Sequence, residues 1–273
     1  MKVFNNFKDA IRHSRKGEFL IFYRGVLFPF KWDFKGSDKT VFFFPGRTAR
    51  EKKAIPVFQR SSYFDNINAN AVSCFDPTLF WSDSLALGWY QGRGNTFYCN
   101  LLGDLIAKVA KAFKTKNSDV FLYGTSGGGI PGFNVAKKIP KCTLYVSNIQ
   151  TDASKYHYRS YKKMIQVSYP KLSEIAILEN MKDRISVDNI DGCFNLIYSQ
   201  NKSDSFHYEN HFKSYITSRP AAPLSDNSFL LYDDPETGHN PLPRNIEINI
   251  INCMLAGEDV KKFLPKCEEI ISR

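Results

Sequence analysis

The stretch FLYGTSGGGIPG, residues 121–132, decides how the rest of the chain is interpreted, because five of its twelve residues are glycine. A flexible linker would be polar on both sides, whereas an apolar run precedes this stretch and a helical pattern follows it. A P-loop needs a lysine directly after its glycines, and none occurs before Lys137. The spacing also differs from the GxGxxG of a dinucleotide site, so all three interpretations are disfavoured.

A nucleophile elbow accounts for the glycines better. Gly124 to Gly128 match G-x-S-x-G, in which a strand turns sharply into a helix with serine at the apex. The serine backbone is strained there, and the residues two before and two after it must be very small. Gly124 and Gly128 occupy those two places, between a predicted strand at 119–123 and a predicted helix at 132–140. The pattern therefore predicts Ser126 as a nucleophile.

The alternation of strands and helices predicts a mainly parallel central sheet with helices on both faces. Together with the elbow, this arrangement predicts an α/β-hydrolase-like fold. The continuous apolar run at 41–44 is typical of a strand buried on both faces, and 100–116 has the clearest helical spacing. No repeat or linker interrupts the chain, so a single domain is expected over 1–273. A polar helical segment at about 153–188 is expected to form a small cap or insertion.

The remaining elements are predicted from the same patterns. Further strands are expected at 18–34 as a pair and at 70–77, 142–148, 193–200 and 228–234, and further helices at 4–14, 207–217 and, as one or two, 245–273.

A serine hydroxyl needs a base, which on this fold is a histidine oriented by a carboxylate, in the chain order Ser, Asp/Glu, His. His239 follows the last predicted strand, and Asp204 follows the strand before it, so these two residues are the expected base and acid. Asp233 and Asp234 are rival acids, but they precede His239 so closely that a role in a turn or in solvation of the sheet edge is favoured.

Acyl transfer also needs donors for an oxyanion. The backbone N–H of Gly127 is the first candidate, and the N–H of Gly46 or Arg47, after the strand at 41–44, is the second. His207 is assigned as a substrate contact or helix start. It lies one helical turn from His211, but no third ligand accompanies the two histidines, so no metal is expected.

Three blocks, GTSGGG (124–129), NKSDSFHYEN (201–210) and TGHN (237–240), together resemble bacterial capsule polysaccharide O-acetyltransferases of the α/β-hydrolase fold. In that family an elbow G-S-S-K-G-G is followed by D-S-[FY]-H and by a late G-H-[DN]. The segment SNIQTDASKYHYRS (147–160) is also similar to the family's segment after the strand beyond the elbow. The resemblance covers about residues 120–240.

The resemblance implies that Ser126 accepts the acyl group, that His239 is the base and that Asp204 orients it. It also implies acetyl-CoA as co-substrate and a polysaccharide as acceptor. This chain departs from the family at Gly127, where the family carries lysine after the serine. The backbone N–H is kept, but a positive side chain near the site is lost.

The chain has a formal net charge of +10, which favours an anionic partner. Arg47, Arg50 and Arg93 are the candidate contacts for an anionic glycan or for the phosphates of CoA. No nucleic-acid-binding motif is present. The six cysteines show no zinc spacing, several lie in apolar runs such as 193–199, and they are interpreted as reduced core residues. With no secretory signal or membrane-length apolar run, a cytoplasmic protein without an integral membrane segment is expected.

The leading hypothesis is a serine acyltransferase that O-acetylates a capsular or other surface polysaccharide through an acyl-Ser126 intermediate. A carboxylesterase or carbohydrate deacetylase with the same Ser-His-Asp triad is the first alternative. The second alternative is a non-catalytic accessory protein of glycan or adhesin export.

Overall fold

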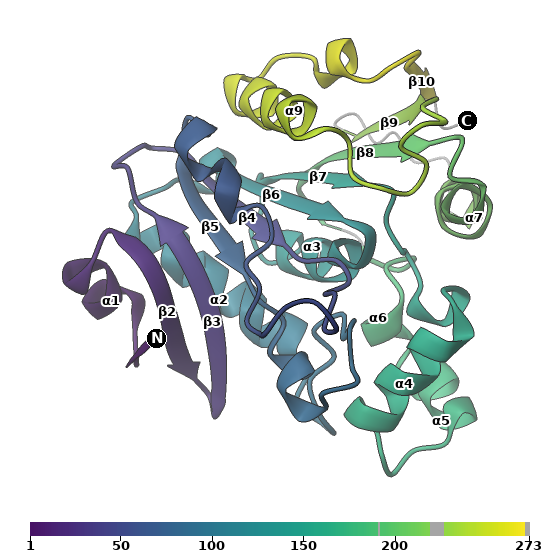
Figure 1. The fold of residues 1–273 in the computed structure, drawn as a ribbon, viewed down its shortest axis with the longest axis horizontal. Coiled ribbons are helices and arrows are strands. Elements are labelled where there is room, and N and C mark those ends of the chain that lie inside the picture. The colour runs from purple at the N-terminus through teal and green to yellow at the C-terminus, as the bar shows by residue number, and fades with distance from the viewer. Residues whose placement is uncertain (191, 219–226, 271–273) are drawn as a thin grey trace.

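The computed structural model describes residues 1–190, 192–218 and 227–270 of the chain. Its centre is one sheet of ten strands in the order β1-β2-β3-β5-β4-β6-β7-β8-β9-β10 (Figure 1). The pairs from β5 through β4 and β6 to β9 are all parallel, and only β2–β3, β3–β5 and β9–β10 are antiparallel. The predicted α/β fold with a mainly parallel sheet is therefore confirmed.

The strands are β1 (Lys2–Phe4), β2 (Lys16–Tyr23), β3 (Val26–Asp33), β4 (Thr40–Phe44), β5 (Asn70–Cys74), β6 (Val120–Thr125), β7 (Thr143–Ser147), β8 (Asn195–Asn201), β9 (Asn227–Tyr232) and β10 (Glu268–Ile270). The α-helices are α1 (Phe7–His13), α2 (Tyr98–Ala112), α3 (Gly129–Ala136), α4 (Tyr158–Ser168), α5 (Glu174–Asn180), α6 (Lys182–Ile185), α7 (Ser205–His207), α8 (Ser214–Ser218) and α9 (Arg244–Ala256). Short 3-10 turns occur at Ser61–Asn66, Pro77–Trp81, Asn117–Asp119, Ser126–Gly128, Ala153–Lys155 and Val260–Phe263, and Tyr208–Lys213 is a π-helical turn.

The central strand β4 is apolar on both sides because helices cover both faces of the sheet. Phe42 and Phe44 pack in one core, together with side chains of α2 and α3. Val41 and Phe43 point to the opposite face and pack in a second core with side chains of α9. All four are at most 1% exposed, so the continuous apolar run at 41–44 follows from burial on both faces.

The two ends of the chain differ most from the predictions. The first helix begins at Phe7 rather than residue 4, since Lys2–Phe4 forms a strand beside β2 and Asn6 caps the helix by accepting from the Asp9 N–H. At the other end, α9 stops where Gly257 has φ 74°, and Glu268–Ile270 forms a strand instead of a helix.

Three further predictions are corrected in detail. The helix expected at 132–140 spans Gly129–Ala136, so it begins directly after the elbow and ends before Pro140. The helix expected at 207–217 is divided by the π-helical turn Tyr208–Lys213. Cys193 is exposed rather than a core residue, because it precedes the first residue of β8.

The segment expected to form a cap contains α4, α5 and α6, which stand together beside the sheet at the lower right of Figure 1. Its two ends lie side by side, because Asp152 and Ser186 form an isolated β-bridge and Val187 N–H donates to Thr151 O at 2.8 Å. A segment that leaves and returns at one point has the geometry of an insertion. The single-domain assignment and the role of the cap stay predictions.

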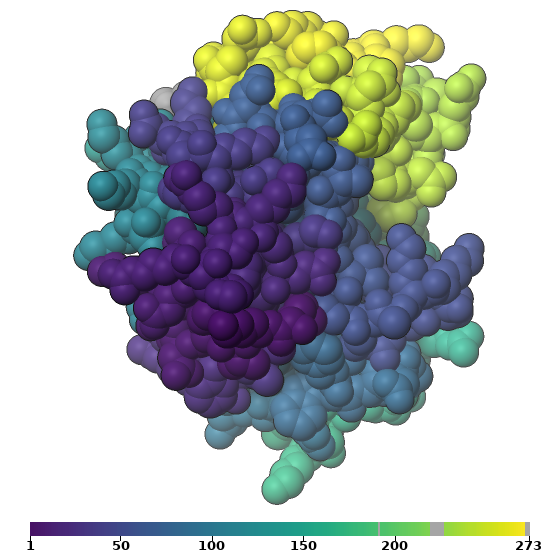
Figure 2. Space-filling model, turned by 60° about the vertical axis from the view of Figure 1, so that its left-hand side comes forward, coloured from purple at the N-terminus to yellow at the C-terminus, as the bar shows by residue number. Residues whose placement is uncertain are grey.

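The space-filling view in Figure 2 shows the purple N-terminal region packed directly against the blue segment that follows it, with the yellow C-terminal region above. None of the helices in the described ranges has the length and apolar character needed to cross a bilayer.

Candidate active site

The elbow at the end of β6 has the strained geometry that its glycines predict. Ser126 has φ 51°, a left-handed conformation that is costly for a residue with a side chain. A Cβ at Gly124 would lie 2.5 Å from the carbonyl oxygen of Gly128, and one at Gly128 would lie 2.7 Å from the carbonyl oxygen of Phe44. Any side chain at either position would force β6, the turn and β4 apart.

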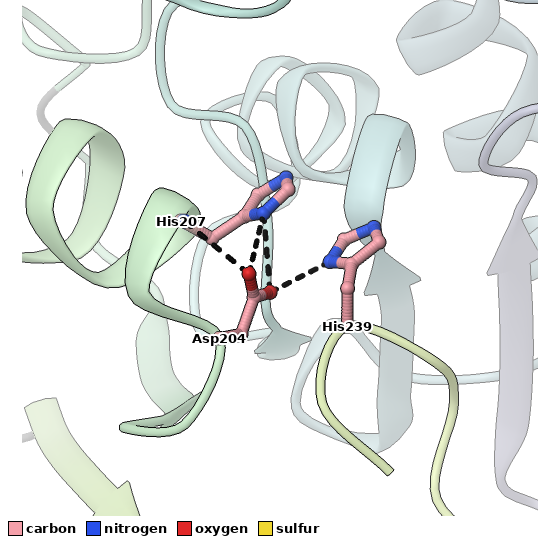
Figure 3. Close-up of side chains that lie close together, drawn as sticks. All are labelled: Asp204, His207 and His239. Atoms are coloured by element: carbon pink, nitrogen blue, oxygen red, sulfur yellow. Dashed lines mark hydrogen bonds and ion pairs between the residues drawn. The ribbon is translucent and has the colours of Figure 1, made fainter. Parts of the chain in front are cut away.

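The ends of three parallel strands bring Ser126, Asp204 and His239 together. Ser126 follows β6, Asp204 follows β8 and His239 lies in the loop after β9. Ser126 Oγ lies 3.2 Å from His239 Nε2. On the other side of the ring, His239 Nδ1 lies 2.7 Å from Asp204 Oδ2 (Figure 3). These distances are those of a hydrogen-bonded nucleophile, base and carboxylate.

Asn201, the last residue of β8, holds the loop that carries the histidine. Its Nδ2 donates to the carbonyl oxygens of Asp234 and Gly238 at 2.8 and 2.9 Å. Its Oδ1 accepts from the N–H groups of Ser203 and Asp234. One buried amide therefore ties the strand end before Asp204 to the loop before His239, and Asp234 takes part as a turn residue.

Gln150, which the sequence analysis missed, contacts the serine. Its Nε2 lies 2.9 Å from Ser126 Oγ and 3.3 Å from His207 Nε2. Its Oε1 accepts from Trp89 Nε1–H at 2.9 Å, which orients the amide because an indole nitrogen can only donate. The position of Gln150, two residues beyond a predicted strand that ends at the same sheet edge as the elbow, was the available signal.

His207 closes a ring of hydrogen bonds through Ser126, His239, Asp204 and Gln150. Since its Nε2 accepts from Gln150, its proton lies on Nδ1, which donates to Asp204 Oδ1 at 3.1 Å (Figure 3). Its ring stacks on that of His239, with centroids 3.9 Å apart and planes 10° apart. At 3% exposed it lies behind His239 and outside the pocket lining, so the structure does not place it as a direct substrate contact.

Burial and hydrogen bonding set the charges of this ring. Burial opposes ionisation of Asp204, but hydrogen bonds from His207 and His239 outweigh it and hold the pKa of the carboxyl well below its usual range. Burial lowers the pKa of His207, although Asp204 opposes that shift. The ring therefore holds one carboxylate and, at His207, a neutral imidazole around neutral pH.

The candidate oxyanion donors differ in availability. The Gly46 N–H donates to Gln59 Oε1 at 3.1 Å, whereas the Arg47 N–H has no acceptor within the described part of the chain. Gln59 Nε2 also donates to Arg47 O at 3.1 Å and so fixes this loop beside Ser126. The geometry favours Arg47 and Gly127 as the donor pair, and this assignment stays a prediction.

A cavity of about 180 Å³ adjoins Ser126 and His239, and its lining includes Arg47, Arg60 and Glu247. Arg50 instead pairs with Asp83 at 2.9 Å outside this lining. Arg93 also lies outside it, with its guanidinium 4.5 Å from the centroid of the Trp81 ring. Among the four predicted substrate contacts, the structure brings only Arg47 to the cavity.

A buried ion pair that the sequence analysis missed supports the end of β6, directly before Ser126. Arg60 Nη2 lies 2.9 Å from both Glu247 Oε1 and Thr125 Oγ1. Tyr63 and Tyr123 also donate to the Glu247 carboxylate, at 2.5 and 2.7 Å. Since Thr125 precedes Ser126, this network links the serine turn to α9.

The ligand atoms of Asp204, His207 and His239 lie within 4.8 Å of one another, a spacing that a metal ion could use. The nitrogens of both histidines that face Asp204 are already at hydrogen-bond distance from its carboxylate (Figure 3). These side chains fit a proton-transfer site, in which both histidines keep the proton on Nδ1 and donate it to the carboxylate.

Comparison with known proteins gives likeness at the level of the fold. No family model matches the sequence, and no curated protein matches it significantly. The structure is similar to that of the capsule O-acetyltransferase of Neisseria meningitidis serogroup A, with a TM-score of 0.61 and 15% identity over 87% of this chain and 94% of that chain.

Two other solved structures are similar. One is a variant of the same O-acetyltransferase in complex with CoA, with a TM-score of 0.56 and 17% identity over 73% of this chain and 80% of that chain. The other is an esterase/lipase from an uncultured bacterium, with a TM-score of 0.58 and 10% identity over 92% of this chain and 89% of that chain. The α/β-hydrolase fold inferred from the elbow is thus confirmed.

Glu247→Gln is expected to lower the free energy of unfolding by roughly 3–5 kcal/mol, because it leaves Arg60 buried without a counter-charge. Urea unfolding measures the change. Glu209→Gln, which breaks an exposed pair with Lys213, is the control and should cost less than about 1 kcal/mol. Equal effects of the two substitutions on the free energy of unfolding would contradict a stabilising role for the buried pair of Arg60 and Glu247.

Stability is expected to fall as the pH drops below about 6.5. Burial lowers the pKa of His211 to about 3, so below 6.5 the unfolded chain binds a proton that the folded chain does not. The slope from this group is about 1.4 kcal/mol per pH unit. Urea unfolding between pH 7 and 4 should show that the free energy of unfolding depends less steeply on pH in His211→Gln. An unchanged slope would exclude His211 as a source of this pH dependence.

Gln150→Leu and His207→Phe are each expected to slow covalent reaction of Ser126 with a fluorophosphonate by about tenfold or more, because each opens the hydrogen-bonded ring. The second-order rate constant is the measurement, taken between pH 6 and 9. His207→Gln, which can keep a donor towards Asp204, should recover part of the rate. If His207→Phe and His207→Gln react as fast as the natural protein, His207 is only a packing residue.

Proposed function

We propose that the protein is a serine acyltransferase that passes an acetyl group from acetyl-CoA through Ser126 to a hydroxyl of a bacterial surface polysaccharide. The observation that carries the proposal is the hydrogen-bonded series Ser126–His239–Asp204 beside a cavity at the ends of parallel strands. The likeness to a capsule O-acetyltransferase, also known with CoA, supports transfer rather than hydrolysis.

In the first half of the reaction, His239 Nε2 takes the Ser126 hydroxyl proton as Oγ attacks the acyl carbonyl carbon. Asp204 stabilises the imidazolium that forms, and the N–H groups of Gly127 and Arg47 stabilise the oxyanion. The thiol of CoA leaves with the proton from His239. In the second half, His239 removes a proton from a sugar hydroxyl as the hydroxyl oxygen attacks the acyl carbonyl carbon, and Ser126 Oγ then leaves with that proton.

The neutral imidazole of His207 suits this cycle, because it stacks on a ring that becomes positive. A neutral aromatic face next to an imidazolium is favourable, whereas a second imidazolium would repel it. Gln150 donates to Ser126 Oγ and so directs the hydroxyl proton towards His239.

The acceptor is proposed to be an anionic glycan, in keeping with the net charge of +10. A cytoplasmic location belongs to the same proposal, since Cys74, Cys99, Cys142 and Cys253 are free thiols buried in the structure. The Leu87 side chain occupies the space beside Gly127, so the lysine that the resembled family carries there would require Leu87 to shift.

A hydrolase with the same triad is the second candidate, favoured by the similar fold-level likeness to an esterase/lipase. The two differ in whether water or a sugar reaches the acyl-enzyme. Incubation with acetyl-CoA and capsule oligosaccharides separates them: acetylated sugar is expected, and release of acetate alone would establish a hydrolase. A non-catalytic role would be shown by an unchanged biological activity of Ser126→Ala.

Ser126→Ala and His239→Ala are each expected to lower the rate of acyl transfer by at least about 10⁴-fold, with Asp204→Asn costing no more than His239→Ala. Acetylated Ser126, detected by mass spectrometry in the absence of acceptor, is the direct readout. His13→Ala changes an exposed histidine outside the site and is the control. Full activity of His239→Ala would overturn the assignment of the base.

A further inference from the structure

A second hollow of about 580 Å³ lies beside the serine cavity, between residues 84–87 and α4. Its lining carries four cations, Arg47, Arg159, Lys162 and Lys163, and includes no Asp or Glu within the part of the chain that is described. We call it the basic groove. A concave surface with charges of one sign concentrates the field and attracts anions.

The cations of α4 lie on the face of the helix that lines the groove. Arg159, Lys162, Lys163 and Gln166 follow the spacing i, i+3, i+4, i+7, which places them along one face of the helix. The opposite face is held in the core by Tyr161, Met164, Ile165 and Ser168, none more than 6% exposed. The orientation of the basic stripe is therefore set by packing.

The groove leads to the nucleophile. Arg47 lines both the groove and the serine cavity, so the two hollows meet at this residue. The Thr48 N–H donates to Ala86 O at 2.8 Å and ties the loop after β4 to the groove wall. Leu87, another wall residue, occupies the space beside Gly127, directly after Ser126.

The groove thus changes in character along its length. Beside the serine turn its wall is apolar at Leu85, Ala86 and Leu87, with Arg47 at the junction of the two hollows, and it is cationic along α4. A matching ligand has a reactive group at one end, a linear uncharged arm in the middle and phosphates at the other end. An anionic polysaccharide, which carries charge in each repeat, fits this division less well.

We infer that the basic groove binds the phosphate-bearing end of a thioester donor, with its uncharged arm along residues 85–87 and its acyl group at Ser126. This assignment rests on the proposed function, and it gives the cap segment a role in donor binding. Arginine and lysine bind phosphate through charge-assisted hydrogen bonds, and salt weakens such contacts.

The test compares the natural protein with the triple variant R159Q/K162Q/K163Q. Acetylation of Ser126 without acceptor is measured with acetyl-CoA and with S-acetylpantetheine, which has the same arm and no phosphates. The variant is expected to lose about tenfold to a hundredfold in the second-order rate constant of acetylation by acetyl-CoA, since each of three partly exposed ion pairs with the phosphates contributes up to about fivefold. The rate with S-acetylpantetheine should stay within about twofold.

The control variant K111Q/K114Q/K116Q removes the same charge from exposed lysines at the end of α2 and beyond, and should behave as the natural protein. Calorimetric titration with CoA gives a second readout that needs no turnover. Equal CoA affinity in both triple variants, or equal losses with both donors, would overturn the inference. A loss confined to transfer onto oligosaccharide would assign the groove to the acceptor instead. Failure of every donor to acetylate the natural protein would overturn the proposed function, while the CoA titration would still test the groove.

Discussion

The left-handed backbone of Ser126 is the constraint on which the site depends. A residue with φ 51° at the end of a buried strand is stable only where the surroundings hold it. Here β4 approaches so closely that its Phe44 carbonyl would clash with any side chain at Gly128, and the turn itself excludes one at Gly124. The apolar packing of β4 and β6 from both faces therefore holds the strained turn that lifts Ser126 Oγ out of the sheet.

Around this turn, the hydrogen bonds between buried polar side chains orient one another. Trp89 orients Gln150, Gln150 sets the proton position of His207, and His207 and His239 share one carboxylate. Such a closed ring tolerates little change, because loss of one member leaves buried partners unsatisfied. On the outer side, the loop after β4 links the site to the basic groove through Arg47.

Prediction from sequence succeeded where the chemistry is local. The elbow needs two glycines at fixed distances from a serine, and the strand order places Asp204 and His239 at the same sheet edge. It failed where a contact joins distant segments. His207 was assigned as a substrate contact or helix start, but the three-residue helix after Asp204 places its ring against that of His239. Arg50 has the same charge as Arg47, yet it pairs with Asp83, which is 33 residues away.

The sequence by itself determined the α/β-hydrolase-like fold, the strained turn at Ser126 and the sheet edge at which Ser126, Asp204 and His239 meet, since these depend on residue type, spacing and periodicity. Only the tertiary structure decided which groups surround them: Gln150 on the serine, Gln59 on the Gly46 N–H, Glu247 against Arg60 and α4 across from Arg47. Each of these joins segments that are brought close by folding alone, because hydrogen bonds and ion pairs depend on separation in space and leave no period or spacing in the chain.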